Sequence, residues 1–386
     1  MKAGWQRNAI GNYCEVIAGQ SPEGKFYNTD RIGMPFYQGK KDFGDKFIKA
    51  PTTWTSDITK TAQKGDILMS VRAPVGPINF ATETVCIGRG LAAIRSKGQL
   101  DGDFLFYQLL HLQPEIAGKE GAVFASINKS EISSLPISVG PLPEQHRIVA
   151  ILDEAFGGIA TAKANTEKNL RNARALFESH LESVFTKRGG GWVDRTLDKV
   201  CIVERGSSPR PIKNYFTTAA DGVNWIKIGD TEEGGKYVFS TAQKITPDGA
   251  KQSRYVKEGD FILTNSMSLG RPYIMKVDGY IHDGWFVLRL GKGINSEFFY
   301  YLLSSSYVQG QFHALAAGAV VKNISGDLVK KAVLPIPPLV QQHDLVERFV
   351  GFSAETQRLE SIYQKKLLAL DDLKKSLLHQ AFSGQL

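Results

Sequence analysis

Two long segments of the chain place apolar or small residues at seven-residue intervals. A second series follows three residues after the first, which is the a/d pattern of a helix that packs against another helix. In the second half the two series are Phe349, Thr356, Tyr363, Leu370, Leu377 and Phe352, Leu359, Lys366, Leu373. In the first half they are Leu152, Ile159, Thr166, Ala173, His180 and Ala155, Ala162, Asn169, Leu176. We expect long helices over residues 143–187 and 340–386.

Shorter apolar runs elsewhere predict a mixed domain in each half. "GDILMSV" and "GDFILTN" are typical of strands that leave a Gly-Asp turn, and "LAAIRS" and "WFVLRL" predict further strands. Helical apolar spacing then predicts a helix packed on each sheet. The strands are expected at 65–71, 91–96, 259–265 and 285–290, and the helices at 103–112 and 297–312. The remaining segments are rich in Gly, Pro, Ser and Asn, which indicates loops.

The two halves of the chain are copies of one unit. "CEVIAGQSP" corresponds to "CIVERGSSP", and "KGDILMSVRAPVG" corresponds to "EGDFILTNSMSLG". The offset between the copies is 187 residues at Cys14, 194 at Lys64 and 197 at Gln145, and it stays at 197 as far as Phe185. Insertions fall only between matching blocks, as loops on a shared fold allow. The chain is therefore a tandem duplication of one domain plus one helix.

This duplication predicts an α+β protein in which two tandem-duplicated globular α/β domains are separated by two long antiparallel helices. Compact domains keep their termini close together, so the end of the first helix is expected near the start of the second. The domains would then lie at opposite ends of a rod of roughly 60 Å, related by a pseudo-two-fold. The four segments are expected at 1–142, 143–187, 188–339 and 340–386.

Composition changes this picture only slightly. The net charge of +8 favours contact with a polyanion, but it is modest for 386 residues, and a basic solvated surface is the alternative. Cys14, Cys86 and Cys201 form no CxxC pair, so neither a disulfide framework nor a zinc site is expected. No signal peptide and no apolar run of membrane-spanning length is recognisable, so we expect a cytoplasmic protein.

The sequence lacks the motifs of common catalytic sites. It has no phosphate-binding loop, no H-E-x-x-H and no G-x-S-x-G, and the prolines at 337–338 are not preceded by the Asn or Asp of an amino-methyltransferase motif. His146 and His343 are equivalent in the repeat and lie at helix starts, which favours a structural or interfacial role. Cys14 and Cys201 are equivalent and flanked by apolar residues, which favours a place in the core. We predict no catalytic residue, no metal site and no cofactor in this chain.

The order of the segments points to a family. A domain, the helix start "PLPEQHRIVAILDEAF", a second domain, the helix start "PPLVQQHDLVERFV" and the closing "QAFSGQL" together resemble the specificity subunit of type I restriction-modification enzymes over essentially the whole chain. The block "SVRAPVG…CIGRGLAAI" supports the resemblance. The second half departs from the pattern, because "SMSLGRP" replaces "RAPVG" and Gln341 stands where the first half has Glu144.

The resemblance implies a function without turnover. Each domain would be a target recognition domain that reads one half of a bipartite site in double-stranded DNA. The helices would set the half-site spacing and dock two methyltransferase subunits, and translocase-nuclease subunits would join that core. S-adenosylmethionine, ATP and magnesium would belong to these partner subunits.

Candidate DNA contacts are polar side chains on Gly- or Pro-bounded loops. Gln can bond an adenine edge, and Lys or Arg can bond guanine or phosphate, although a solvated surface role is an equal alternative for any one residue. The candidates are Gln38, Lys40, Lys41, Arg72, Asn128, Lys129, Arg205, Arg210, Lys227, Asn265, Ser266, Arg271, Lys322 and Asn323.

For the methyltransferase interface we select residues near the two helix starts, together with the outward faces of both helices. The alternative for Ile148 and Leu345 is that they seat each helix on its own domain. The selected residues are Pro143, Gln145, Ile148, Gln342 and Leu345.

Two other functions stay open from sequence. The chain could be an architectural scaffold whose paired domains bind proteins rather than DNA, in which case steep salt-dependent DNA affinity would be absent. An unrecognised nuclease or methyltransferase is disfavoured by the missing motifs. For a DNA reader, half-sites about 34–36 Å apart would suit paired major-groove recognition.

Overall fold

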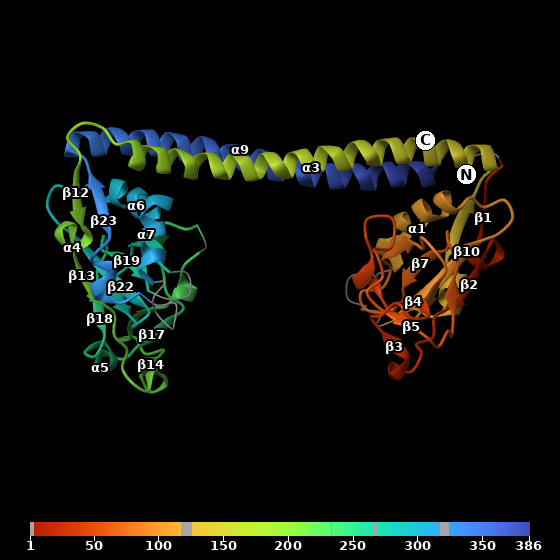
Figure 1. The fold of residues 1–386 in the computed structure, drawn as a ribbon, viewed down its shortest axis with the longest axis horizontal. Coiled ribbons are helices and arrows are strands. Elements are labelled where there is room, and N and C mark those ends of the chain that lie inside the picture. Colours follow the sequence, from red (N-terminus) through yellow and green to blue (C-terminus); the bar gives the residue numbers. More distant parts are fainter. Residues whose placement is uncertain (1–3, 117–125, 233, 266–268, 317–323) are drawn as a thin grey trace. The chain divides into compact units, whose positions relative to one another are not determined.

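The chain folds into two α+β domains, each followed by a long helix (Figure 1). The long helices, α3 (Leu142–Lys187) and α9 (Leu339–Ser383), occupy the segments in which the seven-residue spacing predicts helices. The structure, a computed structural model of the chain, describes residues 4–116, 126–232, 234–265, 269–316 and 324–386.

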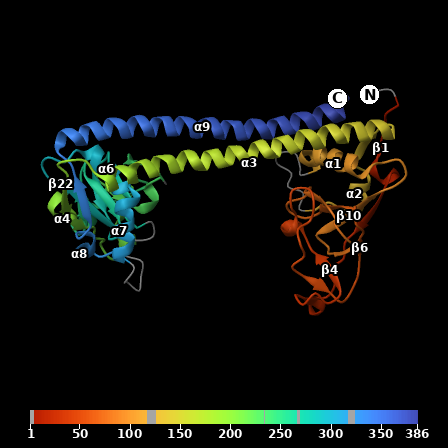
Figure 2. The same ribbon diagram turned by 45° about the horizontal axis from the view of Figure 1, so that its top comes forward.

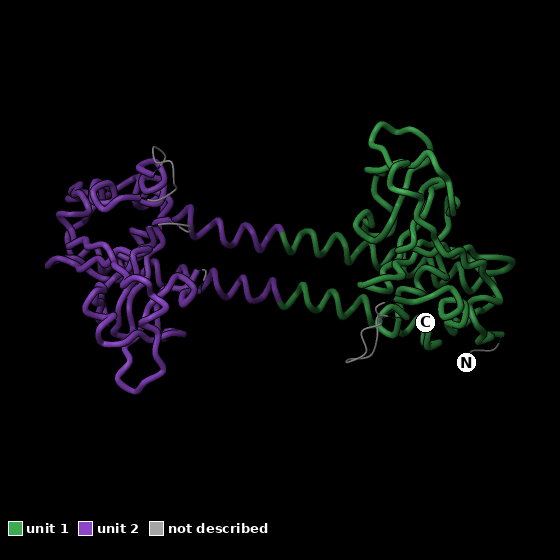
Figure 3. The backbone as a smooth tube through the Cα atoms, turned by 90° about the horizontal axis from the view of Figure 1, so that it is seen from below, with its two compact units in different colours: residues 1–167, 365–386 green, residues 168–364 purple. Residues whose placement is uncertain are grey.

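Two compact units divide the chain differently from the four predicted segments. Unit 1 comprises residues 1–167 and 365–386, and unit 2 comprises residues 168–364 (Figure 3). Helix α3 therefore begins in unit 1 and ends in unit 2, and helix α9 begins in unit 2 and ends in unit 1. Each unit thus contains one domain, the start of one long helix and the end of the other.

The two helices run antiparallel within each unit, as predicted. In unit 1, Lys163 Nζ of α3 lies 2.6 Å from Asp371 Oδ1 of α9. Nearer the start of α3, Lys374 Nζ of α9 lies 4.9 Å from the centre of the Phe156 ring, so the residue numbers run in opposite directions. In unit 2, Arg174 Nε lies 3.1 Å from Glu360 Oε2 and the rings of His180 and Phe352 are 4.9 Å apart, which gives the same direction. Such exposed ion pairs add little stability, about 0–1 kcal/mol each, but they fix the register of the two helices.

Domain 1 contains two main sheets and a small pair of strands. The antiparallel sheet has the order β2 (Cys14–Ala18), β10 (Leu91–Ser96), β7 (Ile67–Ser70), β8 (Ile78–Phe80). The mixed sheet has the order β3 (Tyr27–Asn28), β5 (Trp54–Thr55), β4 (Met34–Tyr37), β9 (Val85–Ile87), β6 (Thr61–Ala62), with β4 and β9 parallel. The pair is β1 (Gln6–Ala9) with β11 (Pro136–Val139), and the helices are α1 (Gly102–Ile116) and α2 (Lys129–Ser133).

Domain 2 repeats this arrangement. Its first sheet has the order β13 (Cys201–Arg205), β22 (Trp285–Leu290), β19 (Phe261–Thr264), β20 (Pro272–Met275), β16 (Tyr237–Val238). Its second has the order β14 (Phe216–Thr217), β17 (Gln243–Ile245), β15 (Val223–Ile226), β21 (Gly279–Ile281), β18 (Arg254–Val256), and β12 (Val193–Thr196) pairs with β23 (Val333–Ile336). The helices are α4 (Leu197–Val200), α5 (Pro247–Ala250), α6 (Ser296–Ser304), α7 (Ser306–Ala316) and α8 (Gly326–Val329).

The predicted strands are confirmed, and the Gly-Asp turns before them have a structural reason. Gly65 adopts a φ of +88°, which favours glycine, and Asp66 after it is buried. The Asp66 carboxylate accepts two hydrogen bonds from Arg95 at the end of β10, at 2.9 and 2.8 Å. Asp260 and Arg289 repeat this ion pair in domain 2, where Nε lies 3.3 Å from Oδ2.

The helix predicted over residues 297–312 is interrupted. Ser305 adopts an extended conformation between α6 and α7, and its hydroxyl accepts a hydrogen bond from Val308 N at 3.4 Å. A serine side chain that caps the backbone in this way starts a new helix. The apolar spacing continues across the break, so the pattern alone does not reveal it.

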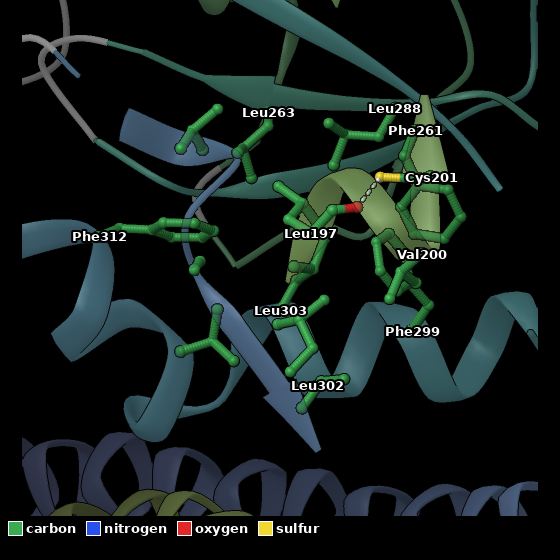
Figure 4. Close-up of a cluster of buried hydrophobic side chains, with 14 of the residues drawn as sticks. Leu197, Val200, Cys201, Phe261, Leu263, Leu288, Phe299, Leu302, Leu303 and Phe312 are labelled. Atoms are coloured by element: carbon green, nitrogen blue, oxygen red, sulfur yellow. Dashed lines mark hydrogen bonds between the residues drawn. The ribbon is translucent and has the colours of Figure 1, made fainter. Parts of the chain in front are cut away.

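The main core of each unit lies between the helices and the first sheet of its domain, which contains β2 in domain 1 and β13 in domain 2. Helix α1 lies against the first part of α3, where the rings of Tyr107 and Phe156 are 5.4 Å apart (Figure 2). In unit 2, Cys201 is packed among Val200, Phe261 and other apolar side chains (Figure 4). Burial raises the pKa of the Cys201 thiol to about 12, so it stays protonated at neutral pH. The predicted core role of Cys14 and Cys201 is confirmed, because both are 5% exposed.

Each core is completed by the end of the long helix that belongs to the other repeat. Phe185, near the end of α3, is fully buried in unit 2, with its ring 5.9 Å from Phe298 of α6. Phe382, near the end of α9, lies 5.4 Å from Phe104 of α1 in unit 1. These residues correspond in the repeat, so the exchange of helix ends is reciprocal.

The predicted helix seam is correct for one of its two series. Leu152, Thr166 and Phe349 of the first series are buried. Leu176 and Leu373, at the far end of the second series, are 57% and 47% exposed. A straight α-helix drifts by about 20° per heptad relative to a seven-residue repeat, so a stripe of this length turns away from the contact.

A buried glutamine joins the start of each long helix to its domain. Gln145 is fully buried, and its Oε1 accepts a hydrogen bond from Asp101 N at 2.8 Å. Its Nε2 donates to the carbonyl oxygens of Gln99 and Gly140, both at 2.8 Å.

Gln342 makes the same three bonds in domain 2. It accepts from Asn295 N at 2.8 Å and donates to the carbonyls of Gly293 and Pro337 at 3.1 and 2.9 Å. Because every polar atom of the amide is used, the two glutamines hold each helix start in one position on its domain.

Replacing Phe382 by Ala is expected to destabilise domain 1, although residue 382 lies in the second repeat. Removing a buried Phe costs about 3–5 kcal/mol, with less for the half-buried Phe382. Hydrogen exchange in α1 and β10 should accelerate while α6 and β22 keep their protection. Phe185→Ala is the matched control and should give the opposite pattern. Equal losses in both domains would contradict the reciprocal packing.

Replacing Gln145 by Leu is expected to lower the stability of unit 1. The change leaves one N–H and two carbonyl groups without partners, and each unpaired buried group costs about 1–3 kcal/mol. The amide of Asp101 should exchange faster, and the urea midpoint of unit 1 should fall. Gln357→Leu, at an exposed position of α9, is the control and should leave both unchanged. An unaltered Asp101 amide would show that the side-chain bond does not form in solution.

Candidate nucleic-acid interface

Three loops of domain 1 converge on a small pocket of about 210 Å³. Gln38 follows β4, Arg72 follows β7, and Arg89 lies in the turn after β9. Because β4 and β9 are parallel, their carboxyl ends meet at the same edge of the sheet, which brings Gln38 and Arg89 together. Lys40 completes the set, and all four residues are exposed.

The loop backbones around the pocket are fixed by hydrogen bonds and by one close approach. Arg89 N donates to Ser21 Oγ at 3.1 Å, and Gly88 N donates to the carbonyl of Tyr37 at 2.8 Å. A Cβ added to Gly90 would lie 2.3 Å from the carbonyl oxygen of Gln38, so only glycine fits there. The side chains that face solvent therefore stand on a rigid frame.

The pocket presents hydrogen-bond donors. The described residues that line it include three cations, Lys40, Arg72 and Arg89, and no carboxylate. Arginine and glutamine are the side chains that bond guanine and adenine edges with two hydrogen bonds, and all four can also meet a phosphate. The arrangement is suited to an anionic, base-bearing ligand.

The structure groups three predicted residues here and adds one that sequence reasoning missed. Gln38, Lys40 and Arg72 line the pocket, and Lys41 is exposed beside it on the same short turn of helix. Arg89 was missed, although it stands in the quoted block "CIGRGLAAI". The sequence feature that could have identified Arg89 is its position between Gly88 and Gly90, just after the end of β9.

Two other predicted residues of domain 1, Asn128 and Lys129, lie at the start of α2. Asn128 accepts a hydrogen bond from Glu131 N at 3.0 Å, and Glu131 bonds back to Asn128 N at 2.7 Å. This reciprocal cap gives the side-chain oxygen of Asn128, Oδ1, a structural role at the helix start. Lys129 is exposed at the first position of the helix.

In domain 2 the corresponding turn carries a carboxylate. Asp283 Oδ1 accepts a hydrogen bond from Ser208 Oγ at 2.8 Å, and Asp283 Oδ2 lies 3.1 Å from Arg210 Nη2. Its carbonyl oxygen accepts from Asn265 Nδ2 at 2.6 Å and from Arg205 Nε at 3.3 Å. Three predicted residues, Arg205, Arg210 and Asn265, therefore bond to Asp283, which was not predicted.

Burial of Asp283 opposes its ionisation, but the hydrogen bond from Ser208 and the charge of Arg210 outweigh that effect. The pKa of the Asp283 carboxyl is therefore held below its usual range. The group is an anion at neutral pH, and Arg210 beside it is largely exposed.

Part of the prediction for domain 2 needs correction. Asn265 is 3% exposed and its amide is bonded inside the loop, so its side chain is not free to contact DNA. Lys227 and Arg271 are half-buried, so their part in DNA contact stays a prediction. The backbone N–H of Lys227 donates to Asp230 Oδ2 at 2.7 Å. The remaining three predicted residues, Ser266, Lys322 and Asn323, lie outside the described residues.

The predicted partner-interface residues also need correction. Gln145, Ile148 and Gln342 are at most 1% exposed, so their side chains cannot contact a partner, and Ile148 seats α3 on its own domain. Pro143 is exposed. Leu345 is half-buried and lines a pocket of about 400 Å³ beside Trp192.

Exposed leucines on the long helices were not singled out by sequence reasoning as a surface. Leu142 and Leu339 correspond in the repeat and are 38% and 45% exposed. Leu176 and Leu373 also correspond and are exposed at the end of the predicted seam. Each unit therefore presents one leucine of each pair to solvent.

Two other features are absent from the part of the chain that the structure describes. No three side chains of His, Cys, Asp or Glu gather there as a metal site would require. None of the described helices is both long enough and apolar enough to span a membrane.

Comparison with known proteins assigns the family. Residues 2–170 and 189–367 both match the family described as Type I restriction modification DNA specificity domain. A putative MjaX specificity subunit of Methanocaldococcus jannaschii is 39% identical over 174 residues, which cover 44% of this chain and 40% of that protein. The MjaVIII specificity subunit of the same organism is 24% identical over 416 residues, covering 99% and 93% of the two chains.

Two solved structures share the fold over the full chain. A chain from work on complex assembly and conformational transition of the type I R-M system has a TM-score of 0.82, with 18% identity and coverage of 100% and 99%. The HsdS subunit from Thermoanaerobacter tengcongensis has a TM-score of 0.63, with 18% identity and coverage of 100% and 98%. The chain therefore belongs to the family of type I restriction-modification DNA specificity domains, and it carries two copies of that domain, one in each repeat.

Proposed function

We propose that this chain is the DNA sequence-specificity subunit of a type I restriction-modification complex, in which each domain reads one half of a bipartite site. The observation that carries the proposal is the pocket of Gln38, Lys40, Arg72 and Arg89, whose turn at Arg89 recurs in domain 2 with Asp283 in the same position. One frame with two sets of polar groups is what two unlike half-sites require. The family match supports DNA over a protein ligand, so the scaffold hypothesis is not favoured.

The proposed role is recognition without turnover. Methyl transfer, translocation and cleavage would be the work of partner subunits, which would hold S-adenosylmethionine, ATP and magnesium. Translocase-nuclease subunits would join the core formed with the methyltransferases. Such a complex acts where the cellular DNA is, so we place it in the cytoplasm.

The paired leucines support docking of two like partners, which we take to be methyltransferase subunits. Because the exposed leucines occur as equivalent pairs, the surface is present twice, once in each unit. The centre of a protein interface is depleted of charged residues, so exposed leucines on an otherwise charged helix suit such a centre. Pro143 beside Leu142 would extend the surface of unit 1. We further propose that the two helices fix the spacing between the half-sites.

The specificity role is tested by single-molecule methylation sequencing of DNA from cells that express this chain with its methyltransferase partner. We expect methylation at a bipartite motif that disappears when the chain is deleted. Exchange of residues 1–140 for those of a relative should change one half of the motif only. Methylation of the same sites without the chain would refute the role, and methyltransferase binding without salt-sensitive DNA affinity would restore the scaffold hypothesis.

The docking surface is tested by replacing the paired leucines with lysine. Leu176→Lys or Leu373→Lys alone should reduce the complex from two methyltransferase subunits to one, and the double variant should bind neither, as native mass spectrometry would measure. Leu368→Lys is the matched control, because Leu368 is 66% exposed on α9 but corresponds to Arg171 in the first repeat. A double variant that keeps both partners would exclude this surface.

A further inference from the structure

The turn between β9 and β10 has the same backbone as the turn between β21 and β22, but the middle residue carries the opposite charge. The first turn is Gly88-Arg89-Gly90, and the second is His282-Asp283-Gly284. Both middle residues donate their backbone N–H to an equivalent serine hydroxyl, Ser21 at 3.1 Å and Ser208 at 3.4 Å.

The turns close in the same way as well. Leu91 N donates to the carbonyl of Gly88 at 2.9 Å, and Trp285 N donates to the carbonyl of His282 at 3.2 Å. The strands on either side, β9 with β10 and β21 with β22, are equivalent in the repeat. Arg89 and Asp283 therefore occupy one position on one frame, and their difference is chemical rather than geometric.

The surface around Arg89 offers hydrogen-bond donors, whereas the surface at Asp283 offers an acceptor. Arg89 lines its pocket together with Lys40, Arg72 and Gln38, so this surface offers hydrogen-bond donors. The Asp283 carboxylate, which is 45% exposed, accepts one bond from Ser208 and one from Arg210. A carboxylate has about four lone-pair sites, so acceptor capacity remains at the surface of domain 2.

The edges of the bases in the major groove also differ in whether they accept or donate hydrogen bonds. Guanine offers the acceptors O6 and N7, which an arginine bonds bidentately, whereas the exocyclic amino group of cytosine donates to a carboxylate. The donor surface of domain 1 matches the first pattern, and the acceptor of domain 2 matches the second.

We propose that the middle residue of this turn determines specificity in each domain, with Arg89 reading a guanine in one half-site and Asp283 reading the amino group of a cytosine in the other. The proposal rests on the proposed function and adds the base class that each domain recognises. Arg210, which is 79% exposed, is placed to meet a phosphate beside Asp283.

The test is methylation sequencing with the full complex and substituted chains. Arg89→Ala should make one guanine position of one half-site degenerate, with discrimination falling on the order of 10- to 100-fold, and it should leave the other half unchanged. Arg89→Lys should restore discrimination only in part, because a lysine ammonium can bond guanine but lacks the rigid planar fork of arginine. Lys97→Ala, at an exposed cation just after the opposite end of β10, is the control and should leave the motif unchanged.

Asp283→Asn supplies the independent arm for domain 2. Because asparagine bonds adenine rather than cytosine, the position that reads cytosine should become degenerate or shift to adenine, with the other half-site unchanged. A uniform loss of methylation with an unchanged motif, rescued by Arg89→Lys, would overturn the proposal and make Arg89 a phosphate contact. A wild-type motif without guanine in one half, or cytosine in the other, would also overturn it. Wild-type complexes without any chain-dependent motif would instead refute the proposed function, and this proposal with it.

Discussion

The reciprocal exchange of helix ends is the constraint on which the rest of the structure depends. Phe185 belongs to the first repeat but completes the core of unit 2, and Phe382 of the second repeat packs on Phe104 in unit 1. Neither repeat therefore contains all of its own core, and the antiparallel pairing of α3 and α9 is built into both units. The contact between Phe104 and Phe382 joins distant parts of the chain, so closing it carries a large loop entropy that local helix formation must offset.

The two domains share their buried polar groups and differ in the charged side chains at their loop tips. The buried ion pair of Asp66 and Arg95 recurs in domain 2, and the bonds of Gln145 recur at Gln342. These groups act inside the protein, where a change leaves buried polar atoms unpaired. The side chains at the middle of the 88–90 and 282–284 turns carry different charges, because both turns are closed by backbone N–H groups that either side chain permits.

Sequence reasoning reached the long helices and the central strands because each depends on periodicity within one segment. It reached the repeat because the two halves share matching blocks in the same order. It misplaced Gln145 at an interface, since glutamine is usually exposed and only the folded backbone shows three partners around it. It missed Arg89 because the parallel pairing of β4 with β9 brings that residue to Gln38, and no local pattern reports such a pairing. It expected Leu373 inside the seam, although a repeat of seven does not tell how far a straight helix drifts.

The fixed register of the helices also has an evolutionary meaning. The offset between repeats changes within the domains but stays at 197 through both long helices. One residue inserted in α3 would turn everything after it by about 100° and break the pairing of Lys163 with Asp371 or the seat of Phe185. The domain loops accept such insertions. Recombination that exchanges a whole domain and leaves both long helices intact would therefore keep the helix pairing unchanged. A lineage can in this way acquire new recognition without evolving a new assembly.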